Sequence, residues 1–422
     1  MDRIKHSPFI QFFYNLPGVR GTYHFLWAWA GAKLHRHPSK KIYVIGVTGT
    51  KGKTTTLELL NAILETAGKR TALLSSLRVK IGEDSQKNNS GNSMPGRANI
   101  QKFLRNAVRA KCGYALIEVT SQGVAAHRHR YIEWNMGILT NIAPEHIEAH
   151  GSFEKYREAK LNFLKYVLEH GGKVFLNRDD RNFPFFSEAL FDHEVMNYSK
   201  DEESLKDYLP LRPKFLLSDF NLSNIAAAVA IAKDMGIGHS TIEEALAAFE
   251  GVQGRMEFVK KGEYTAVVDY AHTPDSLEAA YQAIRPRSTA QYPNPKLICV
   301  LGAAGGGRDR WKRPAMGTIA AEYCDRVILT DEDPYDEDPE QILSEIEEGI
   351  VNSERKPTGI YKIPNRSEAI DEAVSHMQPG DVVIGTGKGS EEWIHIAHGQ
   401  KVPWNERAAF EAALRNKALG QQ

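Results

Sequence analysis

The sequence predicts an α/β fold of two domains, each built on a mostly parallel sheet. Apolar runs typical of buried strands alternate with amphipathic stretches typical of helices, which is the rhythm of parallel α/β sheets. Paired glycines in "FEGVQGRMEFV" (249–259) mark the change from one α/β unit to the next, so we place a domain boundary near Val252. The expected strands lie near residues 42–47, 114–119, 136–141, 173–177, 265–269, 297–302, 326–330 and 381–385.

Composition limits the kinds of partner that the whole chain can attract. Fifty-three basic residues balance 53 acidic ones over 422 residues, so no net field recruits nucleic acid or an anionic membrane. Binding must therefore come from local sites. Cys112, Cys299 and Cys324 show neither a metal-ligand spacing nor a Cys-x-x-Cys motif, so we expect structural thiols in a reducing, cytoplasmic setting.

The N-terminal segment, residues 1–40, is short and aromatic. Its apolar run "FLWAWAGA" (25–32) follows basic residues but is too short to span a bilayer. We expect an aromatic helix from about Tyr23 to Leu34 docked on the body of the protein. The alternative is a weak interfacial contact with a membrane through Trp27 and Trp29. Further along, residues 83–97 are expected to form a polar loop, since few of them are apolar.

A glycine-rich turn, "VIGVTGTKGKTTTLELL" (44–60), joins the first expected strand to an expected helix, residues 54–67. Its glycines are spaced three apart and miss the strict phosphate-loop pattern, yet they still fall between strand and helix. Such a turn directs backbone N–H groups and a helix N-terminus at an anion. Lys53 can then reach the terminal phosphates of a nucleotide, and the Thr54 hydroxyl can hold Mg²⁺. The alternative is a Gly/Thr-rich turn that binds nothing.

Polar residues also follow the next strands of the first half. Glu118 leaves the strand of "ALIEVTSQG" at the edge where open α/β sheets bind ligands, although a solvated glutamate is the simpler reading. "GILTNIAPEHIEAHG" places Asn141, Glu145, His146 and His150 on a loop. The helix expected after that loop carries Tyr156 and Lys160 four residues apart, hence on one face.

Ten motifs in one order now give the chain a family resemblance. It resembles the ATP-dependent Mur ligases, most closely the type that adds the third residue of the peptidoglycan stem peptide, over about residues 40 to 400. The resemblance implies a central P-loop ATPase domain (41–252), a C-terminal Rossmann-like ligase domain (253–422) and small-molecule partners only. The motifs are "GVTGTKGKTTT", "EVTSQGVAAHR", "TNIAPEHIEAHGSFEKYREAK", "LNRDD", "FNLSN", "GRMEF", "VDYAHTPDSL", "GGGRDRWKRPAMG", "TDEDPYDEDP" and "GTGKGSEE".

The resemblance also implies roles for individual residues. ATP and two Mg²⁺ ions are the expected cofactors, with Thr54 and Glu118 on one ion and His146 on the other. Lys160 matches the lysine that the family carbamylates, which would give the second ion an oxygen ligand. The implied catalytic residues are Lys53, Glu118, His146 and Lys160. The implied ATP-binding residues are Gly49, Thr50, Gly52, Lys53, Thr54, Thr55, Asn141, Asn221, Arg255 and Asp269, the last two across an interdomain cleft. The implied substrate-binding residues are Ser93, Ser121, Arg128, His272, Asp333, Tyr335, Lys388 and Glu391.

The implied mechanism is acyl activation. A substrate carboxylate attacks the γ-phosphate of ATP, giving an acyl phosphate and ADP, and an amine then displaces phosphate. Only some forty residues precede the glycine-rich turn, so we expect no full uridine-binding domain, and the acceptor is a muramyl-peptide-like carboxylate or another one. "NSMP" (92–95) stands where the family has Asn-Thr-Thr-Pro. A folate-type glutamate ligase and a non-catalytic nucleotide-binding relative remain the alternatives.

The motif "TDEDPYDEDP" bears on which amino acid is added. In relatives specific for meso-diaminopimelate the matching stretch is Asp-Asn-Pro-Arg, and its arginine holds the distal carboxylate, whereas Tyr335 stands here. Glu391 matches the glutamate that holds the amino group, and Ser390 replaces a histidine. We therefore expect an amino acid without a distal carboxylate, lysine first, unless residues 331–338 are only a solvated acidic loop.

Overall fold

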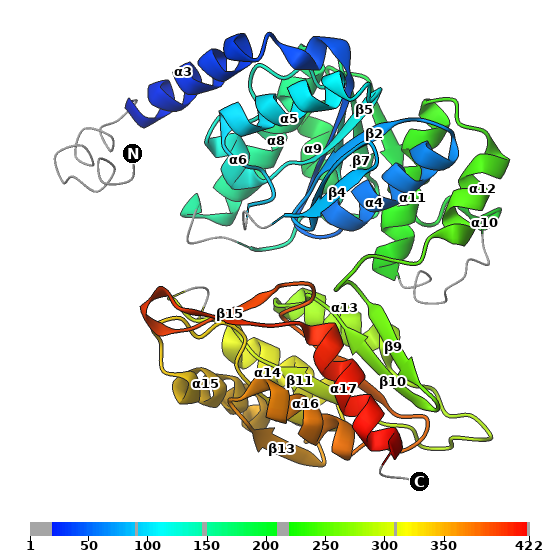
Figure 1. Cartoon of the computed structure of the whole chain (residues 1–422), viewed down its shortest axis with the longest axis vertical. Coiled ribbons are helices and arrows are strands. Elements are labelled where there is room, and N and C mark those ends of the chain that lie inside the picture. Colours follow the sequence, from blue (N-terminus) through cyan, green and yellow to red (C-terminus); the bar gives the residue numbers. More distant parts are fainter. Residues whose placement is uncertain (1–18, 89–91, 146–149, 209–218, 308–309, 420–422) are drawn as a thin grey trace. The chain divides into compact units, whose positions relative to one another are not determined.

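The computed structural model describes residues 19–88, 92–145, 150–208, 219–307 and 310–419. The chain forms two compact units, Met1–Phe249 and Glu250–Gln422, here called unit 1 and unit 2 (Figure 1). Each unit has its own sheet covered by helices, so the predicted α/β class is confirmed. No helix in the described ranges combines the length and the apolarity that crossing a bilayer requires.

The sheet of unit 1 has eight strands in the order β4-β3-β2-β5-β1-β6-β7-β8. Six of them run parallel, and β3 and β4 form an antiparallel hairpin at one edge. Val47 of β1 lies beside Glu118 of β5 and Ile138 of β6, so these three strands end together. The strands are β1 (Tyr43–Thr48), β2 (Thr71–Leu74), β3 (Arg78–Ile81), β4 (Asp84–Lys87), β5 (Tyr114–Glu118), β6 (Met136–Leu139), β7 (Lys173–Asn177) and β8 (Val195–Tyr198).

The hairpin corrects one prediction from the sequence. Residues 83–97 were expected to form a polar loop throughout, but Asp84–Lys87 is strand β4. Its first three side chains are exposed, so the strand has no apolar pattern to reveal it. What makes it a strand is backbone pairing with β3, which only the folded hairpin supplies.

The helices of unit 1 cover both faces of this sheet. Helix α4 follows β1 directly and packs against α11 and α12, while α3 packs against α5. The aromatic helix expected from Tyr23 to Leu34 is present as α3. The helices are α3 (Val19–Leu34), α4 (Lys53–Thr66), α5 (Arg97–Arg109), α6 (Ser121–Ala125), α8 (Phe153–Glu169), α9 (Phe183–Ala189), α10 (Glu203–Lys206), α11 (Asp219–Asp234) and α12 (His239–Ala248).

The sheet of unit 2 has six strands in the order β13-β12-β11-β14-β10-β9, of which only β9 is antiparallel to its neighbour. A small hairpin, β15 (Trp393–His395) with β16 (Lys401–Pro403), follows the last central strand. The sheet strands are β9 (Glu257–Lys261), β10 (Tyr264–Val268), β11 (Leu297–Leu301), β12 (Arg326–Leu329), β13 (Gly359–Lys362) and β14 (Val382–Gly385). The helices are α13 (Pro274–Ile284), α14 (Lys312–Tyr323), α15 (Pro339–Asn352), α16 (Arg366–Ser375) and α17 (Glu406–Leu419).

Two of the three cysteines differ from the expectation. Cys299 in β11 and Cys324 at the end of α14 form a disulfide, so the prediction of reduced thiols was wrong for this pair. Cys324 lies just before β12, which runs beside β11, and this pairing of strands brings the two sulfurs together. A spacing of 25 residues carries no sign of it. Cys112 is a buried free thiol, as expected.

A buried ion pair ties together the loops that leave β12 and β14. The side chains of Arg366 and Glu406 are both 0% exposed, and the guanidinium donates to both carboxylate oxygens at 2.6 and 2.8 Å. The same guanidinium donates to the carbonyl of Asp331 at 2.9 Å and to that of Thr386 at 2.7 Å. Arg366 thus holds the first residues of the loops that follow β12 and β14.

We expect Glu406→Ala to cost about 3 to 5 kcal/mol of stability, because it leaves the Arg366 charge buried and unpaired. Urea unfolding would measure the loss. Glu411→Ala is the matched control on the same helix, since Glu411 pairs with Arg407 at the surface and its removal should cost less than about 1 kcal/mol. Equal losses for the two variants would contradict the role given to Arg366.

Candidate active site

The loop between β1 and α4 is shaped by two glycines. Gly49 has φ +145° and Gly52 has φ +80°, values that other residues adopt only with strain. A Cβ atom on Gly49 would lie 1.9 Å from Oγ1 of Thr140, and one on Gly52 would lie 2.1 Å from Oδ1 of Asn224. The predicted strand–turn–helix arrangement is therefore present, and both glycines are needed for it.

Asn141, at the end of β6, holds this loop through its main chain and its side chain. Its carbonyl accepts from the Thr50 N–H at 2.8 Å, its Oδ1 accepts from the Lys51 N–H at 2.9 Å, and its Nδ2 donates to the Lys51 carbonyl at 3.0 Å. The predicted role of Asn141 was nucleotide binding, whereas the contacts described here go to the loop.

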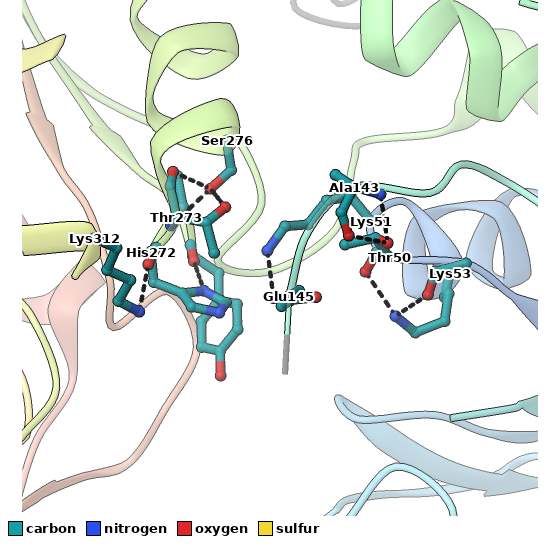
Figure 2. A network of polar contacts seen from close by, with 12 residues as sticks. Thr50, Lys51, Lys53, Ala143, Glu145, His272, Thr273, Ser276 and Lys312 are labelled. Carbon is teal, nitrogen blue, oxygen red and sulfur yellow. Dashed lines mark hydrogen bonds and ion pairs between the residues drawn. The ribbon is translucent and has the colours of Figure 1, made fainter. Parts of the chain in front are cut away.

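Lys53 begins α4 and folds back over the same loop. Its ammonium donates to the carbonyls of Gly49 at 3.0 Å and Thr50 at 2.8 Å (Figure 2). The side chain is only partly buried, so it has solvent on one side. Its neighbour Thr55 is also partly exposed in the first turn of the helix.

Thr54 and Glu118 meet at the carboxyl edge of the sheet. The Thr54 hydroxyl donates to Oε2 of Glu118 at 3.0 Å and lies 3.0 Å from the Ser76 hydroxyl. Oε2 of Glu118 also accepts from the Ser76 N–H at 2.9 Å. A hydroxyl and a carboxylate side by side form the oxygen donor set that suits Mg²⁺. The sequence did not point to Ser76, because nothing local links it to Glu118.

Lys160 is buried within the same cluster. Its Nζ donates to the Gly49 carbonyl at 2.7 Å, the carbonyl that Lys53 also contacts, and it lies 4.6 Å from the centre of the Tyr156 ring. Burial lowers the pKa of Lys160 well below its usual value, the Lys53 charge lowers it further, and Glu145 and Glu118 oppose this. The amine is thus more readily neutral than a surface lysine.

Tyr156 connects the helix of Lys160 to the loop. Its hydroxyl lies 2.9 Å from Oγ1 of Thr50. The same Thr50 oxygen accepts from the Ala143 N–H at 3.0 Å and donates to the Ala143 carbonyl at 3.3 Å. Burial raises the pKa of the Tyr156 hydroxyl, so it stays protonated at neutral pH.

The loop after Asn141 contributes fewer groups than expected. Lys51 and Glu145 form an ion pair at 2.9 Å (Figure 2), and His150 lies 3.0 Å from the Ser121 hydroxyl. His146, a predicted metal ligand, lies outside the described residues. Within the described ranges, no group of three or more His, Cys, Asp and Glu side chains is arranged to hold a metal.

The predicted acceptor-binding residues of unit 1 lie in a second cluster. Arg128 donates to Oδ1 of Asn92 at 3.2 Å and to the Met94 carbonyl, so it holds the segment that contains Ser93. Ser121 is buried at the start of α6. Asn221, the predicted adenine contact, is also buried, in the first turn of α11.

In unit 2, Lys388 lies between two predicted substrate-binding carboxylates. Its fully buried ammonium donates to Asp333 at 2.8 Å and to Glu391 at 2.6 Å. Burial alone would lower the pKa of Lys388, but Glu391 and Asp333 raise it above its usual value. Asp333 also accepts from the His395 N–H at 2.8 Å, and Glu391 accepts from the Tyr270 hydroxyl at 3.1 Å.

Tyr335 follows this cluster in a strained backbone conformation, with φ +53°. Its ring stacks on His395 at 5.2 Å, and its N–H donates to the His395 carbonyl at 3.1 Å. The stretch 331–338 is therefore anchored to β15 rather than being only a solvated loop. Asp336, with its side chain 74% exposed, belongs to the part that does face water.

The remaining predicted residues of unit 2 have local contacts. The Arg255 guanidinium lies 4.1 Å from the centre of the Tyr270 ring. Both carboxylate oxygens of Asp269 accept backbone N–H groups, from Ala271 at 2.8 Å and from Met256 at 2.7 Å. These two contacts make Asp269 a structural residue, whatever else it binds.

His272 lies on the loop between β10 and α13. Its Nδ1 lies 2.8 Å from the Tyr270 carbonyl, and its own carbonyl accepts from the Lys312 ammonium at 2.9 Å (Figure 2). Thr273 and Ser276 cap the start of α13 beside it. The loop therefore presents the His272 ring from a fixed backbone.

Glu332 was not singled out as a site residue. It is 6% exposed, and no described residue makes a hydrogen bond with its buried Oε2. Burial raises the pKa of Glu332 to about 7, Glu391 and Asp333 raise it as well, and Lys312 and Lys388 oppose them. The only signal in the sequence is the extra acid before Asp333, which does not reveal burial.

We expect Glu332 to make a contribution to stability that falls as pH rises from about 5 to about 8, and Glu332→Gln to remove that contribution. Between its usual pKa of 4.5 and the folded value of about 7, the folded state keeps a proton that the unfolded state has lost. At about 1.4 kcal/mol per unit the effect is about 3 kcal/mol, fully present above pH 7. Urea unfolding at several pH values would measure it. Glu354→Gln, a change at an exposed position, is the control, and a parallel pH course for both variants would contradict the assignment.

Comparison with known proteins identifies the family and the two domains of the chain. Residues 47–214 match the Mur ligase middle domain, and residues 254–389 match the glutamate ligase domain of Mur ligases. Among solved structures, a UDP-N-acetylmuramoyl-L-alanyl-D-glutamate--2,6-diaminopimelate ligase has a TM-score of 0.59 at 24% identity, covering 92% of this chain and 82% of that one. E. coli FolC with ADP has a TM-score of 0.62 at 17% identity, covering 98% and 96%. These two likenesses concern the fold alone.

Curated relatives are similar over most of their length. A UDP-N-acetylmuramyl-tripeptide synthetase of Roseiflexus sp. is 35% identical over 425 residues, covering 92% of this chain and 82% of that protein. A UDP-N-acetylmuramoyl-L-alanyl-D-glutamate--2,6-diaminopimelate ligase of Syntrophomonas wolfei is 34% identical over 407 residues, covering 92% and 81%. The resemblance seen in the sequence is thereby confirmed: the chain belongs to the Mur ligase family of ATP-dependent acid–amino-acid ligases.

Proposed function

We propose that this Mur ligase couples a muramyl-peptide-like carboxylate to an amino acid in the synthesis of the peptidoglycan stem peptide. The names of the two relatives support the substrate class, since both act on muramyl compounds. One structural observation carries the proposal: Lys53, Thr54, Glu118 and Lys160 gather around the Gly49 loop. Residues 41–252 would form the ATP-binding domain, and residues 253–422 would form the second ligase domain. The proposed location is the cytoplasm, which supplies ATP and amino acids.

In the proposed ATP site, the Gly49–Gly52 loop and the start of α4 receive the phosphates. The Lys53 ammonium donates hydrogen bonds to two loop carbonyls. A phosphate oxygen would accept a stronger hydrogen bond from it, because the acceptor would also be charged. Thr50, Thr55 and the backbone N–H groups of the loop would add donors. The proposed nucleotide contacts beyond this loop are Asn141, Asn221, Arg255 and Asp269.

The oxygen donors near the loop also fit a magnesium site. Thr54 and Glu118 would hold one Mg²⁺, and His146 with a carbamylated Lys160 would hold a second. When bound, the metal supplies positive charge that stabilises the phosphates during transfer. The residues of this chain place their hydroxyl and carboxylate oxygens beside the phosphate loop.

Carbamylation of Lys160 needs a neutral amine, which its surroundings favour. In that step the Nζ lone pair attacks the carbon of CO₂, an N–C bond forms as one C=O π pair moves onto oxygen, and an N–H bond breaks to release one proton to water. The product is an anion, which would attract the Lys53 ammonium where the protonated amine would repel it. Burial is the main cause of the lowered pKa of Lys160, and the modification would replace the Lys53 repulsion that adds to it with an attraction.

We expect Lys160→Ala to lower turnover at least about a hundredfold while ATP binding stays largely intact, because a charge-stabilising group is lost from the transition state. ADP release and nucleotide titration would measure the two. Bicarbonate or short carboxylates should restore part of the activity. Lys155→Ala, at an exposed position on the same helix, is the control. Normal turnover of Lys160→Ala would refute the proposed carbamate.

The proposed reaction has two steps. A carboxylate oxygen of the acceptor attacks the γ-phosphorus and ADP leaves, and the amine of the amino acid then attacks the acyl carbon and phosphate leaves. Lys53 and Arg255 would offset negative charge on the phosphates. In unit 1, Ser93, Ser121 and Arg128 would bind the acceptor. Arg128 supports this proposal because its guanidinium orders the segment from Asn92 to Met94.

For the amino acid, we propose lysine. Lys388 is already neutralised by Asp333 and Glu391, so it offers little to a distal carboxylate. Tyr335 brings no charge, and its ring is committed to His395. Bringing a carboxylate into this acidic surrounding without a paired cation would cost about 2 to 5 kcal/mol, whereas an ammonium suits it. Glu391, Asp333 and His272 would contact the amino acid.

We expect phosphate release with a muramoyl-L-alanyl-D-glutamate acceptor to be at least about tenfold more efficient with lysine than with meso-diaminopimelate. Alanine and ornithine complete the panel. Tyr335→Arg should lower the ratio of lysine to meso-diaminopimelate efficiency, since it restores a cation for the distal carboxylate, while the control Phe191→Arg adds the same charge at an exposed site of unit 1. A preference for meso-diaminopimelate would overturn the lysine proposal. Activity only with a folate acceptor and glutamate would overturn the muramyl assignment.

A further inference from the structure

Helix α3 carries several large apolar side chains that are exposed to solvent. Leu26 is 54% exposed, Trp27 51% and Trp29 44%, and Tyr23 and Leu34 are exposed as well. At roughly 100° per residue, Tyr23, Trp27 and Leu34 share one side of the helix, and Leu26 and Trp29 extend the exposed surface around it. We call these five residues the aromatic face. Figure 1 shows α3 at the margin of unit 1, extending away from the sheet. Such a concentration of large exposed apolar side chains marks an interaction site.

The opposite side of α3 already accounts for its attachment to the protein. Ala28 and Ala32 are buried there, and Gly31 approaches α5 so closely that a Cβ atom would lie 3.2 Å from Cα of Ala98. A helix that is apolar on both sides is normally covered on both sides. Packing against α5 therefore explains why Ala28 and Ala32 are small and buried, but it does not explain why Trp27 and Trp29 are large, apolar and exposed.

The charge around this face is predominantly positive. Neither α3 nor α5 contains an aspartate or glutamate, and Lys33, Arg36 and Lys102 are exposed. Lys102, Arg105 and Arg109 lie near enough to His35 to lower its pKa, together with burial, which is the largest cause. Lys40 nearby is paired with Glu133 at 3.4 Å. The chain as a whole carries no net charge, so this is a local excess.

We propose that the aromatic face, with the basic residues of α3 and α5, docks on an anionic lipid surface. Tryptophan and tyrosine favour the boundary between headgroups and hydrocarbon, and lysine and arginine are attracted to anionic headgroups. The Lys33 ammonium, 4.8 Å from the centre of the Trp29 ring, combines the two properties at one point. The contact is peripheral and does not depend on the ligase activity.

Charge distinguishes lipid from a second copy of this chain. Two such faces packed together would bring their lysines and arginines against each other, and like charges in an interface are costly. An anionic membrane offers apolar depth and opposite charge at once. A dimer through α3, or cover by the first 18 residues, is an outcome that the experiment separates.

The test is cosedimentation of the full chain with vesicles of phosphatidylcholine alone and of equal parts phosphatidylcholine and phosphatidylglycerol. We expect binding to the anionic vesicles at least about tenfold stronger, and loss of most binding in high salt. Trp27→Gln with Trp29→Gln should lower binding about tenfold or more, as should Lys33→Gln with Arg36→Gln and Lys102→Gln.

Matched controls remove similar groups elsewhere. Phe191→Gln with Met196→Gln alters two exposed apolar residues of unit 1, at 78% and 37% exposure, and Lys69→Gln with Lys260→Gln and Lys261→Gln removes three exposed lysines. Both controls should bind like the unaltered protein, and all variants should keep its thermal unfolding midpoint. The proposal would be overturned if the unaltered protein did not bind anionic vesicles, or if the Trp27/Trp29 variant bound them as strongly as the unaltered protein. A dimer of the unaltered protein that this variant abolishes would overturn it as well. Binding that appears only after removal of residues 1–18 would also overturn it.

Discussion

The carbonyl of Gly49 is the point on which the site of unit 1 depends. Two lysines, Lys53 from α4 and Lys160 from α8, donate to this one oxygen at 3.0 and 2.7 Å. The arrangement requires the positive φ of Gly49, because any side chain there would collide with Thr140. It also places two amines close together in a buried setting, which favours the neutral form of one of them. The turn at Gly49 thereby helps to set the protonation state of Lys160.

Unit 2 differs from unit 1 in its electrostatics, because most of the buried charges described in it are paired with opposite charges. Lys388 takes two carboxylates, and Arg366 takes Glu406 and two loop carbonyls. Buried pairs of this kind contribute little net stability, yet each partner is costly to remove. Their effect is to hold the loops after β12 and β14 in one conformation. Glu332 differs, since its Oε2 is buried without a hydrogen bond to any described residue.

Pairing in unit 2 and repulsion in unit 1 give the two units distinct electrostatic properties. Where opposite charges meet, as at Lys388, the charges are satisfied within the protein. At Lys53 and Lys160 two amines contact one carbonyl, and burial together with the Lys53 charge favours the neutral form of Lys160. The family assignment rests on the comparisons and not on these contacts.

The sequence alone determined the α/β class, the strands around β1, the glycine turn and the family, because these depend on local periodicity and on motifs in a fixed order. Tertiary structure decided what depends on distant partners. Strand β4 exists only through pairing with β3, and the disulfide of Cys299 only through the pairing of β11 with β12. Ser76 meets Glu118, and Glu332 loses its water, through contacts between separate segments. Burial and hydrogen bonding are properties of surroundings, and a sequence pattern does not specify which surroundings a side chain will have.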